Sequence, residues 1–155
     1  MRRLVPFLPL VAAIALLLSG ALESLRFDAS PVSAKEEIVV VEHATTDAVV
    51  DLGEKGDTAG DTLVFSNDIY DSNDADVVGS DQGSCVRTKP GKAWECTWTT
   101  TLSDGSLTVQ GPFYDDGSDS SLAITGGTGD YSGATGEMRL RTRDNNEYEF
   151  TFDIN

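Results

Sequence analysis

Apolar and polar residues alternate with a period of two along most of this chain, and this alternation restricts the possible folds more than any other feature. From Lys35 to the C-terminus the alternating runs are separated by clusters of Gly, Asp, Asn and Ser, with no convincing helical apolar period. A period of two places successive side chains on opposite faces of a strand. The sequence therefore predicts an all-β domain.

The alternating runs define eight candidate strands, enough to close a small antiparallel barrel. Such a barrel is just wide enough to be filled by side chains or to hold one small ligand. Two predicted interior stripes are Trp94, Cys96 and Trp98 on one strand, and Tyr148, Phe150, Phe152 and Ile154 on another. The predicted strands are Glu37 to Ala44, Asp61 to Ser66, Val77 to Thr88, Lys92 to Leu102, Ser106 to Pro112, Ser120 to Thr125, Glu137 to Arg143 and Glu147 to Ile154.

A glycine-rich segment, Leu122 to Gly129, lies between two of these runs. Because glycine tolerates positive φ and close backbone approach, the segment predicts a tight corner between two strands. On the strand before it, Leu107, Val109 and Phe113 share one face.

Three motifs carry a resemblance to a known family: LTVQGPF from Leu107, LAITGGTGDYSGATGE from Leu122, and LVFSNDIYD from Leu63. They resemble the allene oxide cyclase-like barrels, which are calycin-type relatives of plant allene oxide cyclases and dirigent proteins. The resemblance covers roughly Ile38 to the C-terminus and implies an antiparallel eight-stranded calycin-like β-barrel. Function needs its own argument, because one fold serves many functions.

The N-terminal segment has the pattern of an export signal. Arg2 and Arg3 precede an unbroken apolar run that ends at Leu18, and small residues follow it. We expect residues 1–34 to be a signal peptide cleaved after Ala34, or after Ala21, with an uncleaved marginal anchor as the alternative. The remaining residues, 35–155, would form one barrel domain in a secreted or extracytoplasmic protein.

The predicted mature domain is strongly acidic. Residues 35–155 contain 8 basic and 24 acidic residues, which gives a net charge of −16. This charge repels phosphate backbones and anionic lipid surfaces, so nucleic-acid binding and peripheral membrane binding are disfavoured. Many of the Asp residues fall in predicted turns, where they also favour solubility.

The two cysteines are predicted to form a disulfide. A hairpin turn centred between Pro90 and Gly91 makes residues whose numbers sum to 181 face each other, as Cys85 and Cys96 do. Opposite side chains on one face of an antiparallel pair come close enough for a disulfide, which would stabilise the fold by about 2 to 3 kcal/mol. The alternatives are two free buried thiols, or a reactive Cys85.

The family resemblance implies a ligand pocket in the barrel. It places Ser66 and Asn67 on the family's Ser-Asn motif, where the Asn helps to hold an ordered water, and Cys85 on a pocket cysteine. Glu42 is the best match to the pocket glutamate. We therefore expect Glu42 and Asn67 to be catalytic and the ligand to contact Ser66, Cys85, Trp98 and Phe113.

Two departures argue against the plant reaction. Phe113 stands where the plant enzymes have a pocket tyrosine, and Ala44 replaces an asparagine. Two hypotheses follow: a barrel that binds a hydrophobic small molecule and steers an intramolecular cyclisation or isomerisation, or a non-catalytic secreted ligand-binding or interaction module. The resemblance also implies self-association as a trimer, which the negative charge opposes at low salt.

No cofactor or metal is expected. The only histidine, His43, cannot build a multi-histidine metal site, and Gly127-Thr128-Gly129 lacks the third glycine and the following helix of a dinucleotide loop. The Asp-rich stretch from Asp71 to Asp76 would at most bind calcium opportunistically, because Ala75 stands where an EF-hand needs an oxygen.

Overall fold

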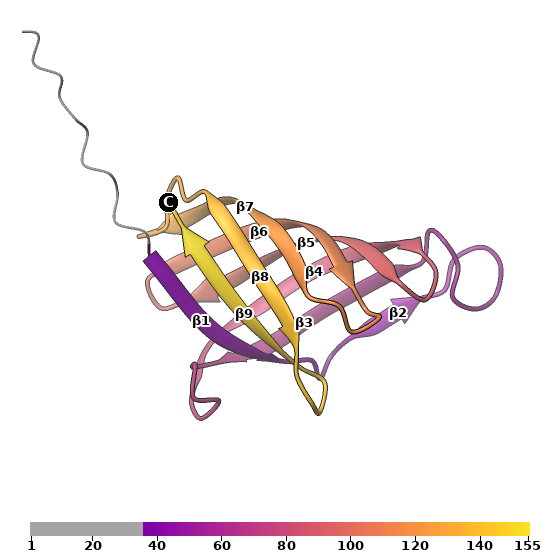
Figure 1. Cartoon of the computed structure of the whole chain (residues 1–155), viewed down its shortest axis with the longest axis horizontal. Coiled ribbons are helices and arrows are strands. Elements are labelled where there is room, and N and C mark those ends of the chain that lie inside the picture. Colours follow the sequence, from indigo (N-terminus) through magenta and orange to yellow (C-terminus); the bar gives the residue numbers. More distant parts are fainter. Residues whose placement is uncertain (1–35) are drawn as a thin grey trace, which may run out of the picture. The chain divides into compact units, whose positions relative to one another are not determined.

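A computed structural model describes residues 36–155, and these form an all-β domain (Figure 1). The export-signal prediction falls on residues outside this described part. Within it, no helix is long and apolar enough to cross a membrane. The strands are β1 (Glu36–His43), β2 (Ala48–Val50), β3 (Thr62–Tyr70), β4 (Val77–Lys89), β5 (Ala93–Leu102), β6 (Gly105–Tyr114), β7 (Ser120–Gly129), β8 (Gly136–Thr142) and β9 (Glu147–Ile154).

The sheet closes on itself, which confirms the predicted antiparallel eight-stranded calycin-like barrel. The strand order is β1-β9-β8-β7-β6-β5-β4-β3, and β1 also pairs with β3 to complete the ring. Every pairing is antiparallel. The ninth strand, β2, was not predicted; it pairs only with β3 and lies at one end of the barrel in Figure 1.

Side chains that alternate inward fill the barrel. Both predicted interior stripes face the core, with Tyr148 half-buried and the other members buried. Leu107 and Val109 are fully buried, whereas Phe113 on the same strand is only partly buried. The centre of the core is made by Ile69, Leu107, Val109, Met138, Phe150 and Phe152.

The glycine-rich segment extends a strand instead of forming the predicted corner. Gly126 to Gly129 belong to β7 and pair with the start of β6, after a register shift near Val109. A Cβ on Gly127 would lie 2.4 Å from the Tyr131 carbonyl oxygen and 2.6 Å from that of Ser106. Glycine is needed here because two backbones approach closely, and the strand therefore runs four residues beyond its predicted end at Thr125.

The outward face of β8 carries a short row of arginines, and each lies next to an acid on β9. Arg139 lies 3.1 Å from Asp153, and Arg141 lies 3.6 Å from Glu149. Arg143 lies close to Glu147 in the same way. This agrees with a solvated strand face paired with neighbouring acids, and such exposed pairs contribute little to stability.

Candidate functional site

A small apolar cavity opens inside the barrel at the end where β1 finishes and β9 begins. The space that the centre of a water molecule can reach is about 30 Å³, enough for roughly two waters. Four of the six predicted catalytic or ligand-contacting residues line it; Ser66 and Asn67 do not. Its lining is Glu42, Asp47, Leu63, Phe65, Cys85, Cys96, Trp98, Phe113, Leu140, Tyr148 and Phe150.

Glu42 brings a carboxyl group into this apolar lining from the inward face of β1. It is buried, and its Oε1 accepts a hydrogen bond of 2.7 Å from Nδ2 of Asn67 on β3. Burial raises the pKa of Glu42 well above its usual value, and the negative charge of Asp81 raises it further. Glu42 is therefore a buried carboxyl that favours its protonated form.

Asn67 lies behind Glu42, and its side-chain amide is fully used by the protein. Nδ2 also donates to Asp47 Oδ1 at 2.9 Å, while Oδ1 accepts from the backbone N–H groups of Thr45 at 3.0 Å and Thr46 at 2.9 Å. Both amide hydrogens are engaged, so this geometry leaves none to hold an ordered water. Asn67 instead fixes the loop after β1 and orients Glu42.

Asp81 completes a buried carboxyl pair that the sequence interpretation missed. It faces Asn67 across β3 and β4, is almost fully buried, and accepts the Asn67 backbone N–H at 3.3 Å. Burial raises the pKa of Asp81 to about 7, and a hydrogen bond with Glu42 partly offsets this rise. A single proton shared by Glu42 and Asp81 would let the pair give or take a proton near neutral pH.

A signal for Asp81 was present in the sequence. Asp81 and Cys85 are four residues apart on one predicted strand, so both side chains face the interior. An Asp inside a strand is easily overlooked in a chain where many Asp residues fall in predicted turns. Strand parity is the better guide at this position.

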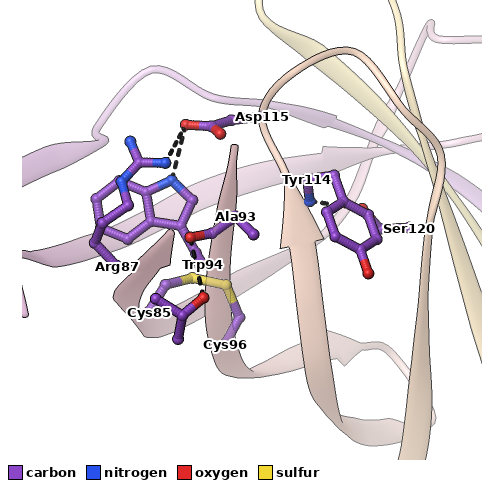
Figure 2. The surroundings of a disulfide bond; sticks show 9 residues. Cys85, Arg87, Ala93, Trp94, Cys96, Tyr114, Asp115 and Ser120 are labelled. Atoms are coloured by element: carbon purple, nitrogen blue, oxygen red, sulfur yellow. Dashed lines mark hydrogen bonds and ion pairs between the residues drawn. A yellow bond between two sulfur atoms is a disulfide. The ribbon is translucent and has the colours of Figure 1, made fainter. Parts of the chain in front are cut away.

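The Cys85–Cys96 disulfide is present and forms one wall of the cavity. The two residues face each other in the β4–β5 register, which confirms the hairpin register and the predicted bridge. Figure 2 shows Arg87 stacked on the Trp94 ring beside the bridge, with its Cζ 3.7 Å from the ring centroid. Asp115 joins the two, 2.7 Å from Arg87 Nη1 and 3.0 Å from Trp94 Nε1.

Aromatic rings make up much of the remaining wall. Phe113 and Tyr148, both half-buried, meet edge to face with their centroids 5.7 Å apart, and Trp98 lies 5.7 Å from Phe150. Trp98 is 4% exposed, yet its Nε1–H has no hydrogen-bond partner in the described part of the chain. The wall is thus apolar apart from this donor, the Tyr148 hydroxyl and the carboxyls of Glu42 and Asp47.

Ser66 and His43 lie outside the cavity. Ser66 is exposed on the outward face of β3, so this placement gives it no contact with a ligand in the lumen. His43 also faces outward, where it stacks on Tyr70 at 3.9 Å and its Nε2 lies 2.7 Å from Asp74 Oδ1. This is the geometry of a hydrogen-bonded strand histidine.

His43, Asp74 and Glu147 form a group in the described residues that could ligate one metal ion. Arg143 lies 3.7 Å from Asp74 and 3.8 Å from Glu147, so a guanidinium already balances these carboxylates. In the adjoining loop Asp71 accepts the Ala75 N–H at 2.9 Å, as expected for an Asp that stabilises its own turn.

This barrel, its interior carboxyls and its motifs define a class of small β-barrel proteins, and sequence comparison identifies the family. Residues 38–153 match the family described as allene oxide cyclase barrel like domain. The match spans most of the chain, so the protein belongs to this family, as the motifs in the sequence predicted.

Solved structures with the same fold belong to proteins that are named for several different activities. A pyocyanin demethylase is 25% identical, with a TM-score of 0.68 over 77% of this chain and 100% of that one. The pterocarpan synthase dirigent protein GePTS1 is 16% identical, with a TM-score of 0.60 over 77% and 86%. The Diels–Alderase AbmU from Streptomyces koyangensis is 16% identical, with a TM-score of 0.63 over 77% and 63%. The last two likenesses concern the fold alone.

Proposed function

We propose that this protein binds a hydrophobic small molecule in the barrel lumen and steers an intramolecular cyclisation or isomerisation there. The observation that carries the proposal is Glu42, a buried carboxyl with a raised pKa in an otherwise apolar cavity. Membership of the allene oxide cyclase barrel like family supports the same class of reaction. Titratable groups shifted in this way are concentrated at functional sites.

The chemistry needs little machinery beyond confinement and one proton. Apolar walls that hold a flexible substrate in one reactive conformer can remove several kcal/mol from the barrier. The Glu42–Asp81 pair would give a proton to a developing negative charge, or take one, within a site of low dielectric constant. Asn67 acts as a positioning residue that holds Glu42 at the wall.

The plant allene oxide cyclase reaction is not part of the proposal. Phe113 lines the cavity without the hydroxyl that the family's tyrosine supplies, and Ala44 lacks the amide of the family's asparagine. Two proteins with a similar structure, a pyocyanin demethylase and a Diels–Alderase, have activities of other kinds on this fold. The substrate must therefore be inferred from this cavity.

Binding requires the cavity to widen, since about 30 Å³ is far below the few hundred Å³ of most ligand sites. Phe113 and Tyr148 are the side chains that would move, because both are half-buried and pack mainly against each other. The narrow lumen and its disulfide wall also favour the second candidate function, a secreted binding or interaction module without turnover.

Export and self-association belong to the proposal as well. A disulfide is compatible with an extracytoplasmic location, because such bonds persist in oxidising compartments. The family resemblance supports a homo-oligomer, with a trimer as the expected form. Light scattering at low and at physiological salt tests this, and a monomer in both would retire the oligomer.

The test is a screen of hydrophobic polyenes, fatty-acid derivatives and phenolics, with binding read by native mass spectrometry and conversion by liquid chromatography. We expect the wild type to bind and convert at least one compound. Glu42→Gln should bind the same compound but convert it at most about one-hundredth as fast. Asn67→Ala should also convert it more slowly than the wild type. Glu36→Gln, an exposed change on the same strand, is the matched control. Binding without conversion by the wild type would favour the module, and no binding would remove both candidates.

A further inference from the structure

The acidic groups of the cavity have no cationic partner among the residues that line it. Glu42 and Asp47 are the ionisable acids of the lining, and no Lys, Arg or His lies among the lining residues. Arg87, an inward-facing residue of β4 near this end, is held by Asp57 at 2.6 Å and Asp115 at 2.7 Å. An anionic group entering the cavity would therefore meet carboxyls and find no cation to pair with.

Tyr148 lies close to these same carboxyls. The pKa of its hydroxyl is raised, first by burial and then by the charges of Asp47, Glu42 and Asp115. Tyr148 lies at the half-buried rim of the cavity, so the negative field of these charges extends to the path that a ligand must take. Any ligand carboxylate would experience the same repulsion as a tyrosinate at this place.

One neutral polar group of the wall can only donate a hydrogen bond. Trp98 lines the cavity, is buried, and has an Nε1–H without a partner among the described residues. An indole N–H can only donate, and buried donors are satisfied in the great majority of proteins. A carbonyl oxygen, hydroxyl oxygen or ring nitrogen of a ligand would satisfy this donor by replacing a water oxygen.

We propose that the cavity selects an uncharged or cationic aromatic molecule that presents a hydrogen-bond acceptor to Trp98 Nε1, and that it rejects carboxylate-bearing molecules such as free fatty acids. This inference rests on the proposed small-molecule site and names its substrate class. Flat rings match the aromatic walls of Phe65, Phe113 and Phe150. A cationic group gains from the ring faces and from Asp47 at the rim, whereas a buried carboxylate loses its hydration without a partner.

Four compounds on one ring skeleton test the proposal: naphthalene, 2-acetylnaphthalene, 2-(aminomethyl)naphthalene and 2-naphthoate. Dissociation constants are measured at neutral pH by ligand-observed NMR titration. We expect 2-acetylnaphthalene and the amine to bind at least about tenfold more tightly than 2-naphthoate, and 2-acetylnaphthalene to bind more tightly than naphthalene. Adding each compound to denatured protein controls for non-specific adsorption.

Two variants separate the two parts of the inference. Trp98→Phe should reduce the preference for 2-acetylnaphthalene over naphthalene while 2-naphthoate stays excluded. Asp47→Asn, at an exposed loop residue whose side-chain oxygen can still accept the Asn67 hydrogen bond, should improve the binding of 2-naphthoate and weaken that of the amine.

The outcomes distinguish this inference from the proposed function. If 2-naphthoate binds the wild type as tightly as 2-acetylnaphthalene does, the substrate class is wrong while the lumen site stands. If Trp98→Phe leaves the preference for the acetyl compound intact, the acceptor assignment is wrong. If none of the four compounds binds and the broader screen also finds no ligand, the proposed function itself fails.

Discussion

The stability of this protein should fall as the pH rises from about 5 to about 8, because a carboxyl pair is buried in the barrel. The pKa of Asp81 is about 7 in the folded protein against an ordinary value of 3.8. Between these values the folded state binds a proton that the unfolded chain has released. The free energy of unfolding therefore decreases with rising pH, which is the sign expected for an acid whose pKa is raised by folding.

The magnitude follows from the same two values. A shift of about three pKa units corresponds to about 4 kcal/mol in all, since each unit is worth about 1.4 kcal/mol. About 3 kcal/mol of this is lost between pH 5 and the folded pKa of about 7. Glu42 shifts in the same direction, but the pair behaves as one unit that binds a shared proton, so the two effects do not simply add. Asp47 contributes negative charge nearby and Asn67 donates to Glu42, and both are retained in the variant below.

Urea unfolding followed by tryptophan fluorescence at about pH 5 and about pH 8 measures the effect. Over this pH range, the free energy of unfolding of the Asp81→Asn variant should fall by less than about half of the fall seen for the wild type. The reason is that the amide cannot ionise. Asp68→Asn removes an exposed carboxylate from β3 and should behave as the wild type does. A wild-type stability that is constant or rises towards pH 8 would refute the reasoning.

Three further changes have defined outcomes. The double substitution Cys85→Ala and Cys96→Ala should lower the free energy of unfolding by about 3 kcal/mol, measured by urea unfolding, because it opens a short covalent loop. Gly83→Ala should cost about 1 to 3 kcal/mol in the same assay, because the new Cβ would lie 2.3 Å from the Trp98 Cβ. Arg87→Lys should cost about 1 to 2 kcal/mol and lower the melting temperature, because lysine cannot contact two carboxylates and stack on an indole at once.

Matched changes on outward faces serve as controls for the disulfide and Arg87 variants. Ser84→Ala with Thr97→Ala alters the exposed pair next to the disulfide in the same register and should change stability little. Arg141→Lys, at an exposed arginine with one partner, is the control for Arg87. Losses as large in the controls as in the buried variants would contradict the assigned contacts. Two thiols that can be alkylated in non-reduced, natively exported protein would contradict the disulfide itself.

Most of the barrel could be predicted from the sequence because one physical rule governs it. A strand with one buried face must alternate, so eight strands and their inward stripes could be read from the period. Ala48–Val50 escaped this rule, because all three residues of β2 are exposed. The end of β3 was also placed too early, since Asn67 faces inward and a polar residue in the interior looks like the start of a turn.

The site was harder to predict because its residues are brought together by pairing between distant strands. The disulfide followed from the register of a single hairpin, which local turn chemistry determines. The contact of Glu42 with Asn67 and Asp81 depends on the closure of β1 onto β3, which no local pattern specifies. For the same reason the saturated amide of Asn67, and hence its structural role, became visible only in three dimensions.

The way the barrel closes has a consequence for the order in which the chain can fold. β1 pairs with β9 along its whole length, from Glu36 to His43, but with β3 at only three positions. The first strand made must therefore wait for the last strand before most of its hydrogen bonds can form. β1 stays largely unpaired until β9 leaves the ribosome or, in an exported chain, emerges on the far side of a membrane. Until then the Glu42 side chain cannot be buried in the barrel interior. Such long-range pairing slows folding and gives a chaperone time to bind the open sheet.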